Sequence, residues 1–140
     1  MPNWCANVVE ITAPEEILHD LEVFLMENDG VLEYFSPLGD RKDRVLAWGT
    51  KWEVDAVAYE RFEETIVLKF DTAWGAPIEA VRDFANRVGA KVKGYYMEPG
   101  LDFCGVYTAT EGDEEEYSIL EAPHEIQDEF PNIMMFIDDE

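Results

Sequence analysis

Apolar residues repeat along this chain with two different periods, and the order of these periods limits the folds that it can adopt. Segments 15–29 and 77–88 have apolar residues at the three- and four-residue spacing of an amphipathic helix. Segments rich in Val, Ile and aromatic residues, which favour strands, surround them at 4–12, 52–59, 65–72, 91–97 and 101–110. This order predicts an α+β, ferredoxin-like split βαβ-βαβ fold, with an antiparallel sheet and both helices on one face.

Residues with strong local preferences predict where the two helices begin and end. Thr12 and Glu15 have the spacing of a capping box, and Gly30 is placed to end the first helix in a left-handed conformation. Pro77 is suited to the first turn of the second helix, and Gly89 to its end.

The remaining segments are less regular. Residues 31–35 are predicted to form a short strand, residues 117–120 a strand that completes an appended hairpin, and residues 123–130 a short helix. A chain of 140 residues is the length of one domain. We therefore expect a single domain, with a ferredoxin-like core at 1–110 and an acidic C-terminal extension at 111–140.

The charge of the chain is strongly negative and unevenly distributed. There are 32 Asp and Glu against 10 Lys and Arg, a net charge of -22, and the last forty residues contain thirteen acids and no base. Such a surface repels the phosphates of nucleic acids and of anionic lipids, so direct binding to nucleic acid or membrane is not expected. The expected partner is a basic protein.

Apolar residues are interleaved with these acids, so the acidic segment can fold and hold its carboxylates in fixed positions. Same-face residues of a strand lie about 6.7 Å apart, and neighbouring strands could approach the charge density of duplex DNA. We therefore expect this surface to mimic nucleic acid and to inhibit a DNA- or RNA-handling protein. The expected interface residues are Asp102, Glu111, Asp113, Glu114, Glu115, Glu116, Glu121, Glu125, Asp128 and Glu129.

The four tryptophans, Trp4, Trp48, Trp52 and Trp74, have two interpretations. They either fill the core beneath the helices, or they line a surface that binds a small ligand or a peptide. The second interpretation is the alternative function of the chain, and it predicts a change in tryptophan fluorescence on binding.

No catalytic motif is recognisable in the sequence. The two histidines, His19 and His124, lack the spacing of a zinc site, and there is no glycine-rich phosphate loop or nucleophile elbow. We therefore expect neither enzyme activity nor a metal or cofactor. A metal-dependent hydrolase built on a carboxylate cluster is the least favoured alternative.

The N-terminus has no basic and apolar stretches of a secretory signal, which predicts a cytoplasmic protein. Cys5 and Cys104 are accordingly expected to be reduced and buried. An exposed strand edge, or the apolar run at 133–137, could support a homodimer.

Three segments carry a family resemblance. They are Met1-Pro2-Asn3-Trp4-Cys5 with Asn7, Trp48-Gly49-Thr50-Lys51-Trp52-Glu53, and Phe70-Asp71-Thr72-Ala73-Trp74. Together with the helix after Pro77, they resemble the Api92-like, or YubB-like, domain family of phages and plasmids over about residues 1 to 110. The resemblance implies a ferredoxin-like fold and a mobile-element origin, and with that origin the expected partner is a host DNA- or RNA-handling or defence protein. It implies no established activity and no catalytic residue.

Overall fold

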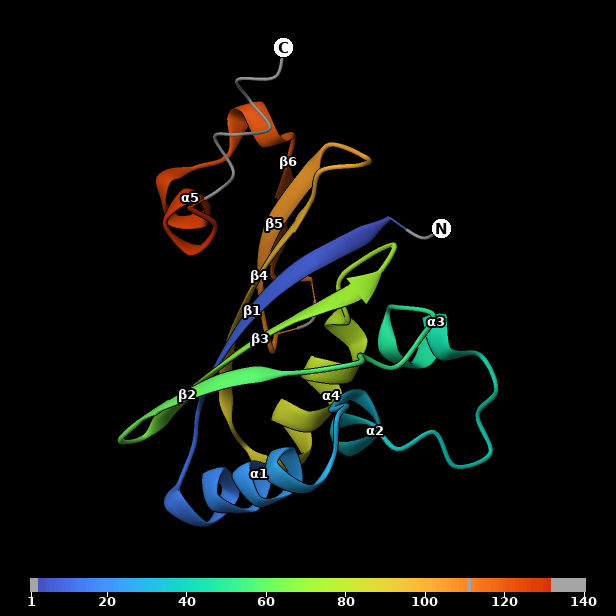
Figure 1. The fold of residues 1–140 in the computed structure, drawn as a ribbon, viewed down its shortest axis with the longest axis vertical. Helices are drawn as coiled ribbons and strands as arrows, with labels where there is room; N and C mark the ends of the chain where they lie inside the picture. The colour runs from blue at the N-terminus through green and yellow to red at the C-terminus, as the bar shows by residue number, and fades with distance from the viewer. Residues whose placement is uncertain (1–2, 111, 132–140) are drawn as a thin grey trace.

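The computed structural model describes residues 3–110 and 112–131, and six strands within them form one open antiparallel sheet (Figure 1). The strand order is β2-β3-β1-β4-β5-β6. The order of the first four is that of a ferredoxin-like split βαβ-βαβ fold, so the predicted fold class is confirmed. The strands are β1 (Trp4–Thr12), β2 (Ala58–Phe62), β3 (Thr65–Ala73), β4 (Lys91–Glu98), β5 (Phe103–Thr108) and β6 (Glu114–Tyr117).

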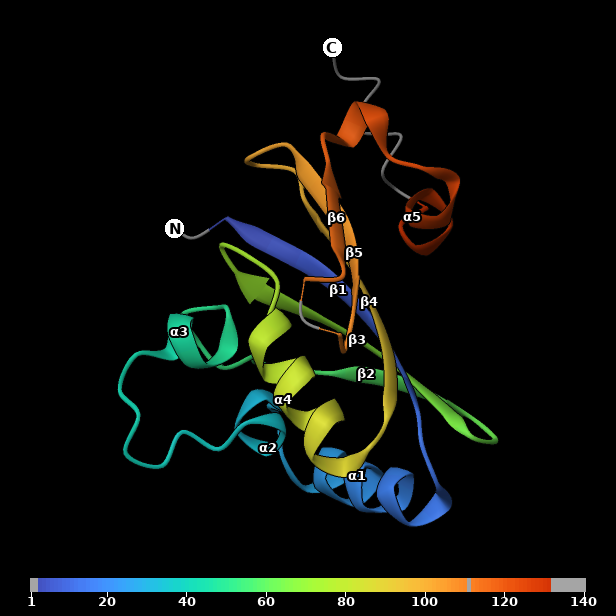
Figure 2. The same cartoon turned by 180° about the vertical axis from the view of Figure 1, so that it is seen from behind.

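Helices cover the two faces of the sheet unequally. Figures 1 and 2 show α1, α2, α3 and α4 on one side and α5 on the other. No helix among residues 3–110 and 112–131 is both long and apolar enough to cross a membrane. The helices are α1 (Glu15–Glu27), α2 (Leu32–Phe35), α3 (Arg44–Trp48), α4 (Ile78–Val88) and α5 (His124–Glu129), with a 3-10 helix, η1, at Ile119–Glu121.

Two hydrophobic clusters stabilise this arrangement. The larger lies between the sheet and helices α1 to α4, and it contains Leu21 and Phe84 from the two predicted amphipathic helices. The smaller lies on the opposite face, where Ile126 of α5 packs with Tyr95 and Met97 of β4. Helix α5 therefore covers part of the face that the first four helices leave open.

The ends of the predicted helices agree with the structure only in part. Thr12 belongs to β1, its hydroxyl lies 3.0 Å from that of Thr65, and α1 begins after Pro14 without a side-chain cap. The predicted capping box is therefore wrong. So is the left-handed ending at Gly30, because α1 stops at Glu27 before an extended Asn28, whereas Gly89 does end α4 with a φ of 73°.

The strand predicted at residues 31–35 is also wrong, because α2 lies there. The carboxylate of Glu53 accepts hydrogen bonds from the backbone N–H groups of Val31, Leu32 and Glu33, at 3.1, 2.9 and 2.8 Å. These are the N–H groups that a helix start leaves without a helical partner. The cap comes from a residue twenty positions away, so local sequence patterns could not reveal it.

Two strands lie a few residues from their predicted positions. β2 was expected at 52–59 but occupies Ala58–Phe62, and β6 was expected at 117–120 but occupies Glu114–Tyr117. A run of three glutamates is unfavourable for a strand by composition. It is held by pairing with β5, where Glu115 faces Val106. The predicted short helix at 123–130 is confirmed as α5.

Candidate functional site

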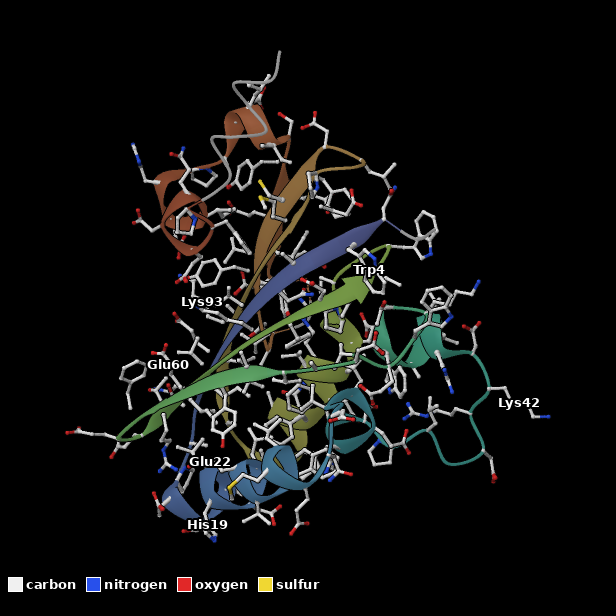
Figure 3. The ribbon with its side chains drawn as sticks, in the orientation of Figure 1. Trp4, His19, Glu22, Lys42, Glu60 and Lys93 are labelled. Carbon is white, nitrogen blue, oxygen red and sulfur yellow. The ribbon has the colours of Figure 1, made fainter. Side chains whose placement is uncertain are left out.

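The three segments that carry the family resemblance meet at one end of the sheet, where β1 and β3 lie side by side. Trp4 pairs with Ala73 across the two strands, and Figure 3 shows Trp4 at this end. The side-chain amide of Asn7 donates a 2.8 Å hydrogen bond to the hydroxyl of Thr72. The hydroxyl of Thr50 donates to the carbonyl of Ala73 at 2.7 Å. Buried polar contacts therefore hold the three segments together.

The four tryptophans divide between the two interpretations. Trp48 is 2% exposed, and its indole N–H donates to the carbonyl of Ser36 at 2.8 Å. Trp4, Trp52 and Trp74 are 45%, 41% and 46% exposed. The core interpretation therefore holds for Trp48 alone, and we call the other three the tryptophan rim.

The local backbone and ring contacts position the rim. The rings of Trp4 and Trp52 are 6.4 Å apart between centroids and inclined by 55°. Trp74 has a φ of 71°, a conformation that side chains other than glycine rarely adopt. Its N–H donates to the carbonyl of Asn3 at 2.8 Å, which fixes it at the end of the two strands.

A cavity of about 250 Å³ opens beside Trp4 and has an acidic lining. Asp55, Ala56 and Asp71 complete its wall. Burial raises the pKa of Asp71, which means that its charged form lacks full hydration. An aromatic face next to two carboxylates suits a Lys ammonium or an Arg guanidinium, which can lie on the ring and pair with the acids.

A second, shallower cavity of about 610 Å³ lies beside Trp52 and has a basic lining. Lys42, Arg44 and Lys51 lie around it, together with Asp43 and Val45. The ammonium of Lys51 lies 5.7 Å from the centre of the Trp52 ring. Trp52 therefore lines the basic cavity and lies against Trp4, which lines the acidic cavity.

The carboxylates expected at an interface in the C-terminal segment are exposed or half-buried, but many have partners within the molecule. Glu114 lies 3.6 Å from Arg82, Glu116 accepts a 2.9 Å hydrogen bond from Tyr96, and Asp113 accepts one of 2.7 Å from Thr108. These contacts fasten β6 and the residue before it to helix α4 and to strands β4 and β5. Glu111 and the apolar run 133–137 lie outside the described residues.

The other predicted interface residues are spread over several elements. Asp102, in the turn between β4 and β5, accepts a 3.1 Å hydrogen bond from the N–H of Ile119. Glu125 of α5 pairs with Lys93 of β4, which Figure 3 shows on the side of the sheet that faces α5. The remaining members are Glu115, which accepts a hydrogen bond from Tyr117, the exposed Glu121 and Asp128, and the half-buried Glu129.

The groups considered for metal or thiol chemistry lie apart from this end of the sheet or are buried. His19 is exposed on α1, as Figure 3 shows, and His124 begins α5. Within residues 3–110 and 112–131, no group of three or more His, Cys, Asp or Glu is arranged to hold a metal ion. Cys5 and Cys104 are free thiols and buried.

The sheet order and the helices packed on it define a ferredoxin-like α+β domain. A family model described as the ferredoxin-like domain in Api92-like protein matches residues 47–136. The match covers more than half of the chain, which therefore belongs to the Api92-like family.

One solved structure and the curated proteins complete the comparison. The crystal structure of protein Api92 from Yersinia pseudotuberculosis is similar at 19% sequence identity, with a TM-score of 0.46. The similarity covers 56% of this chain and 29% of that one, so the chain spans less than a third of the length of Api92. No curated protein matches the chain.

Proposed function

We propose that this chain is a binding domain for a basic protein, and that its partner is a host nucleic-acid-handling or defence protein that it inhibits. The observation that supports this most directly is the acidic cavity between Trp4, Asp55 and Asp71. A Lys or Arg side chain of the partner enters this cavity, with its charged end between the two carboxylates and its stem on the indole.

The exposed rim supplies the affinity of such an interface. Trp is among the residues that most often dominate binding energy when partly exposed side chains become buried. A cation on an indole face contributes about 0.5–2 kcal/mol, more as water is excluded. The net charge of -22 adds long-range attraction that accelerates encounter with a basic partner. A mobile-element origin and a place in the host cytoplasm belong to the same proposal.

The test is capture of partners from host lysate by the tagged chain, at low and at high salt, with and without added duplex DNA. We expect a basic protein that high salt and DNA both release. Its affinity for the purified chain is then measured with Trp4→Ala and with the double variant Asp55→Asn/Asp71→Asn, both of which should bind at least about tenfold more weakly.

Phe62→Ala is the matched control, because Phe62 is also an exposed aromatic residue but lies on β2 beside a different cavity. It should bind as the parent chain does. Equal binding by all three variants would remove the acidic cavity from the interface. Capture that is unaffected by salt would contradict the basic partner itself.

A second candidate is mimicry of nucleic acid by the C-terminal carboxylates. The observation in its favour is that Glu114, Glu115 and Glu116 are exposed on β6, a strand at the edge of the sheet, and that the exposed Asp113 directly precedes them. Neutralising Glu115, Glu121 and Asp128 to Gln, Gln and Asn leaves the contacts of Asp113, Glu114 and Glu116 in place. Weaker binding by this variant, with normal binding by the rim variants, would favour mimicry over the acidic cavity.

The rim also suits the alternative of a small ligand or a peptide. The acidic cavity would then accept a single cationic group, such as the side chain of a short basic peptide. Titration of the chain with a lysine-rich peptide, followed by tryptophan fluorescence, tests this alternative. A saturable change that Trp4→Ala removes would support it, and an unchanged signal would exclude it for that peptide.

A further inference from the structure

Helix α3 presents apolar side chains to solvent beside the basic cavity. Leu46 is 78% exposed, and Val45 and Trp52 are exposed as well. Lys42, Arg44 and Lys51 line the same cavity as Val45 and Trp52. We call these six residues the basic face, and large apolar groups that stay in water together mark a surface that binds another molecule.

The bases of this face gather around one cavity in a strongly acidic chain. Arg61, Arg82 and Lys93 pair with carboxylates. Within residues 3–110 and 112–131 no ion pair involves Lys42, Arg44 or Lys51, and the same holds for the four remaining bases, Arg41, Lys69, Arg87 and Lys91. Three bases and one acid, Asp43, line the cavity, so the local charge favours a partner that is acidic and apolar.

The chain itself carries a surface of that chemistry. Leu101 and Leu120 are 58% and 52% exposed, and each is followed in sequence by an exposed acid, Asp102 and Glu121. The hydrogen bond from the N–H of Ile119 to Asp102 brings the two leucine–acid pairs together. We call these four residues, Leu101, Asp102, Leu120 and Glu121, the acidic face.

The two faces occupy different parts of the surface. Figures 1 and 2 show the turn between β4 and β5 and the segment after β6 at one end of the molecule, and α3 elsewhere. One copy can therefore use both faces at once. The acidic face and the basic face of a single copy cannot meet each other, but those of two different copies can.

We propose that the chain associates with itself head to tail, the acidic face of one copy binding the basic face of the next. Leu101 and Leu120 pack on Val45, Leu46 and Trp52, while Asp102 and Glu121 meet the three bases. Because the two faces are different, the contact is heterologous, and it produces a ring or a chain of copies. This inference does not depend on the proposed function.

The net charge predicts how salt affects this association. Two copies of charge -22 repel each other at long range when salt is low. At physiological salt the screening length is about 8 Å, so this repulsion falls while pairs in contact persist. Self-association should therefore be strongest at intermediate salt, whereas capture of a basic partner should weaken steadily as salt rises.

The experiment measures the mass of the full chain by sedimentation equilibrium over a wide range of concentration. A first variant removes the basic face with Lys42→Glu, Leu46→Glu and Lys51→Glu. A second removes the acidic face with Leu101→Lys, Leu120→Lys and Glu121→Lys. Arg44 and Asp102 are left unchanged, because Arg44 lies over the Trp48 ring and Asp102 bonds to Ile119.

We expect the parent chain to associate with increasing concentration, and each variant alone to associate at least about tenfold more weakly. An equal mixture of the two variants should form a 1:1 dimer, because one intact face of each remains. Met26→Glu, which changes an exposed apolar residue of α1, is the control and should associate as the parent does.

The inference is overturned if the parent chain stays monomeric at every concentration and salt, or if the mixture does. It is also overturned if either variant, folded by circular dichroism, associates like the parent. The double variant Asp55→Asn/Asp71→Asn should associate normally even though it loses partner capture. Failure of self-association and failure of the proposed function can therefore be told apart.

Discussion

Tyr107 of β5 lies across Gly94, the residue that faces it on β4. A Cβ added at Gly94 would overlap the ring atoms of Tyr107. The neighbouring pair is arranged in the same way with the strands exchanged, so that Tyr96 lies over Gly105. The two rings are 6.1 Å apart and buried. Two glycines therefore make room for two tyrosines that fill the core over this hairpin.

Gly94→Ala should destabilise the fold by about 1–3 kcal/mol, because the added methyl group forces the Tyr107 ring out of its position. The free energy of unfolding in urea measures this effect. Gly75→Ala is the control, since the nearest atom to its Cβ is a backbone oxygen 3.8 Å away. Equal stability of the two variants would show that the ring has another position at little cost.

Trp48→Phe should cost about 1–3 kcal/mol, because it leaves the buried carbonyl of Ser36 without the indole N–H that it accepts. Trp52→Phe, at an exposed position, should change the free energy of unfolding by less than about 0.5 kcal/mol. Chemical denaturation of both variants provides the comparison. A larger loss at Trp52 than at Trp48 would reverse the assignment of core and rim.

Glu129 should make stability depend on pH, because burial, and then the carboxylate of Glu10, raise its pKa above the ordinary 4.5. A carboxyl group whose pKa is raised in the folded state is stabilised by its proton. The stabilising contribution of the Glu129 carboxyl group to the free energy of unfolding is therefore fully present below about pH 4.5. It is lost as the pH rises through the raised pKa of the folded state.

Glu129→Gln removes this loss, so the variant should be more stable relative to the parent at pH 7 than at pH 4. Unfolding curves of both proteins at several pH values give the difference. Glu10→Gln removes the neighbouring charge and should reduce the same dependence. A difference between parent and variant that does not change with pH would contradict the raised pKa.

The two cysteines should resist thiol reagents in the folded protein. Burial, followed by the Glu98 carboxylate, raises the pKa of Cys5 to about 12. Burial, followed by Asp102, raises that of Cys104 to about 11. At pH 8 we expect both to react with a disulfide reagent at least about a hundredfold more slowly than in denaturant. Met26→Cys provides an exposed thiol, and equal rates for all three would contradict burial.

The elements that sequence periodicity predicted well are those whose cause is local. α4 has its apolar stripe, Pro77 before it and Gly89 after it, and all three are within one segment. α3 could have been found by the same reasoning. Asp43 accepts a 3.2 Å hydrogen bond from the N–H of Leu46, and Gly49 follows in a left-handed conformation. These signals were missed because the charged residues 41–44, at the start of the helix, are typical of a turn or loop.

Two other elements, one missed and one displaced, depend on distant partners. α2 needs the carboxylate of Glu53, and the glutamates of β6 need Arg82 and Tyr96. The candidate site is of the same kind, because Trp4, Asp55 and Asp71 come from three segments that only the folded sheet brings together. The sequence identified the tryptophans as a candidate surface, but not the two carboxylates beside Trp4.

The position of β1 between β3 and β4 has a consequence for how the chain folds. β1 precedes the other strands of the sheet in the chain, but its two neighbours, β3 and β4, begin only at Thr65 and Lys91. One edge of β1 must therefore wait unpaired until β3 has been made, and the other edge until β4 has been made as well. Contacts between residues so far apart in sequence slow folding, because a long loop must close before they form.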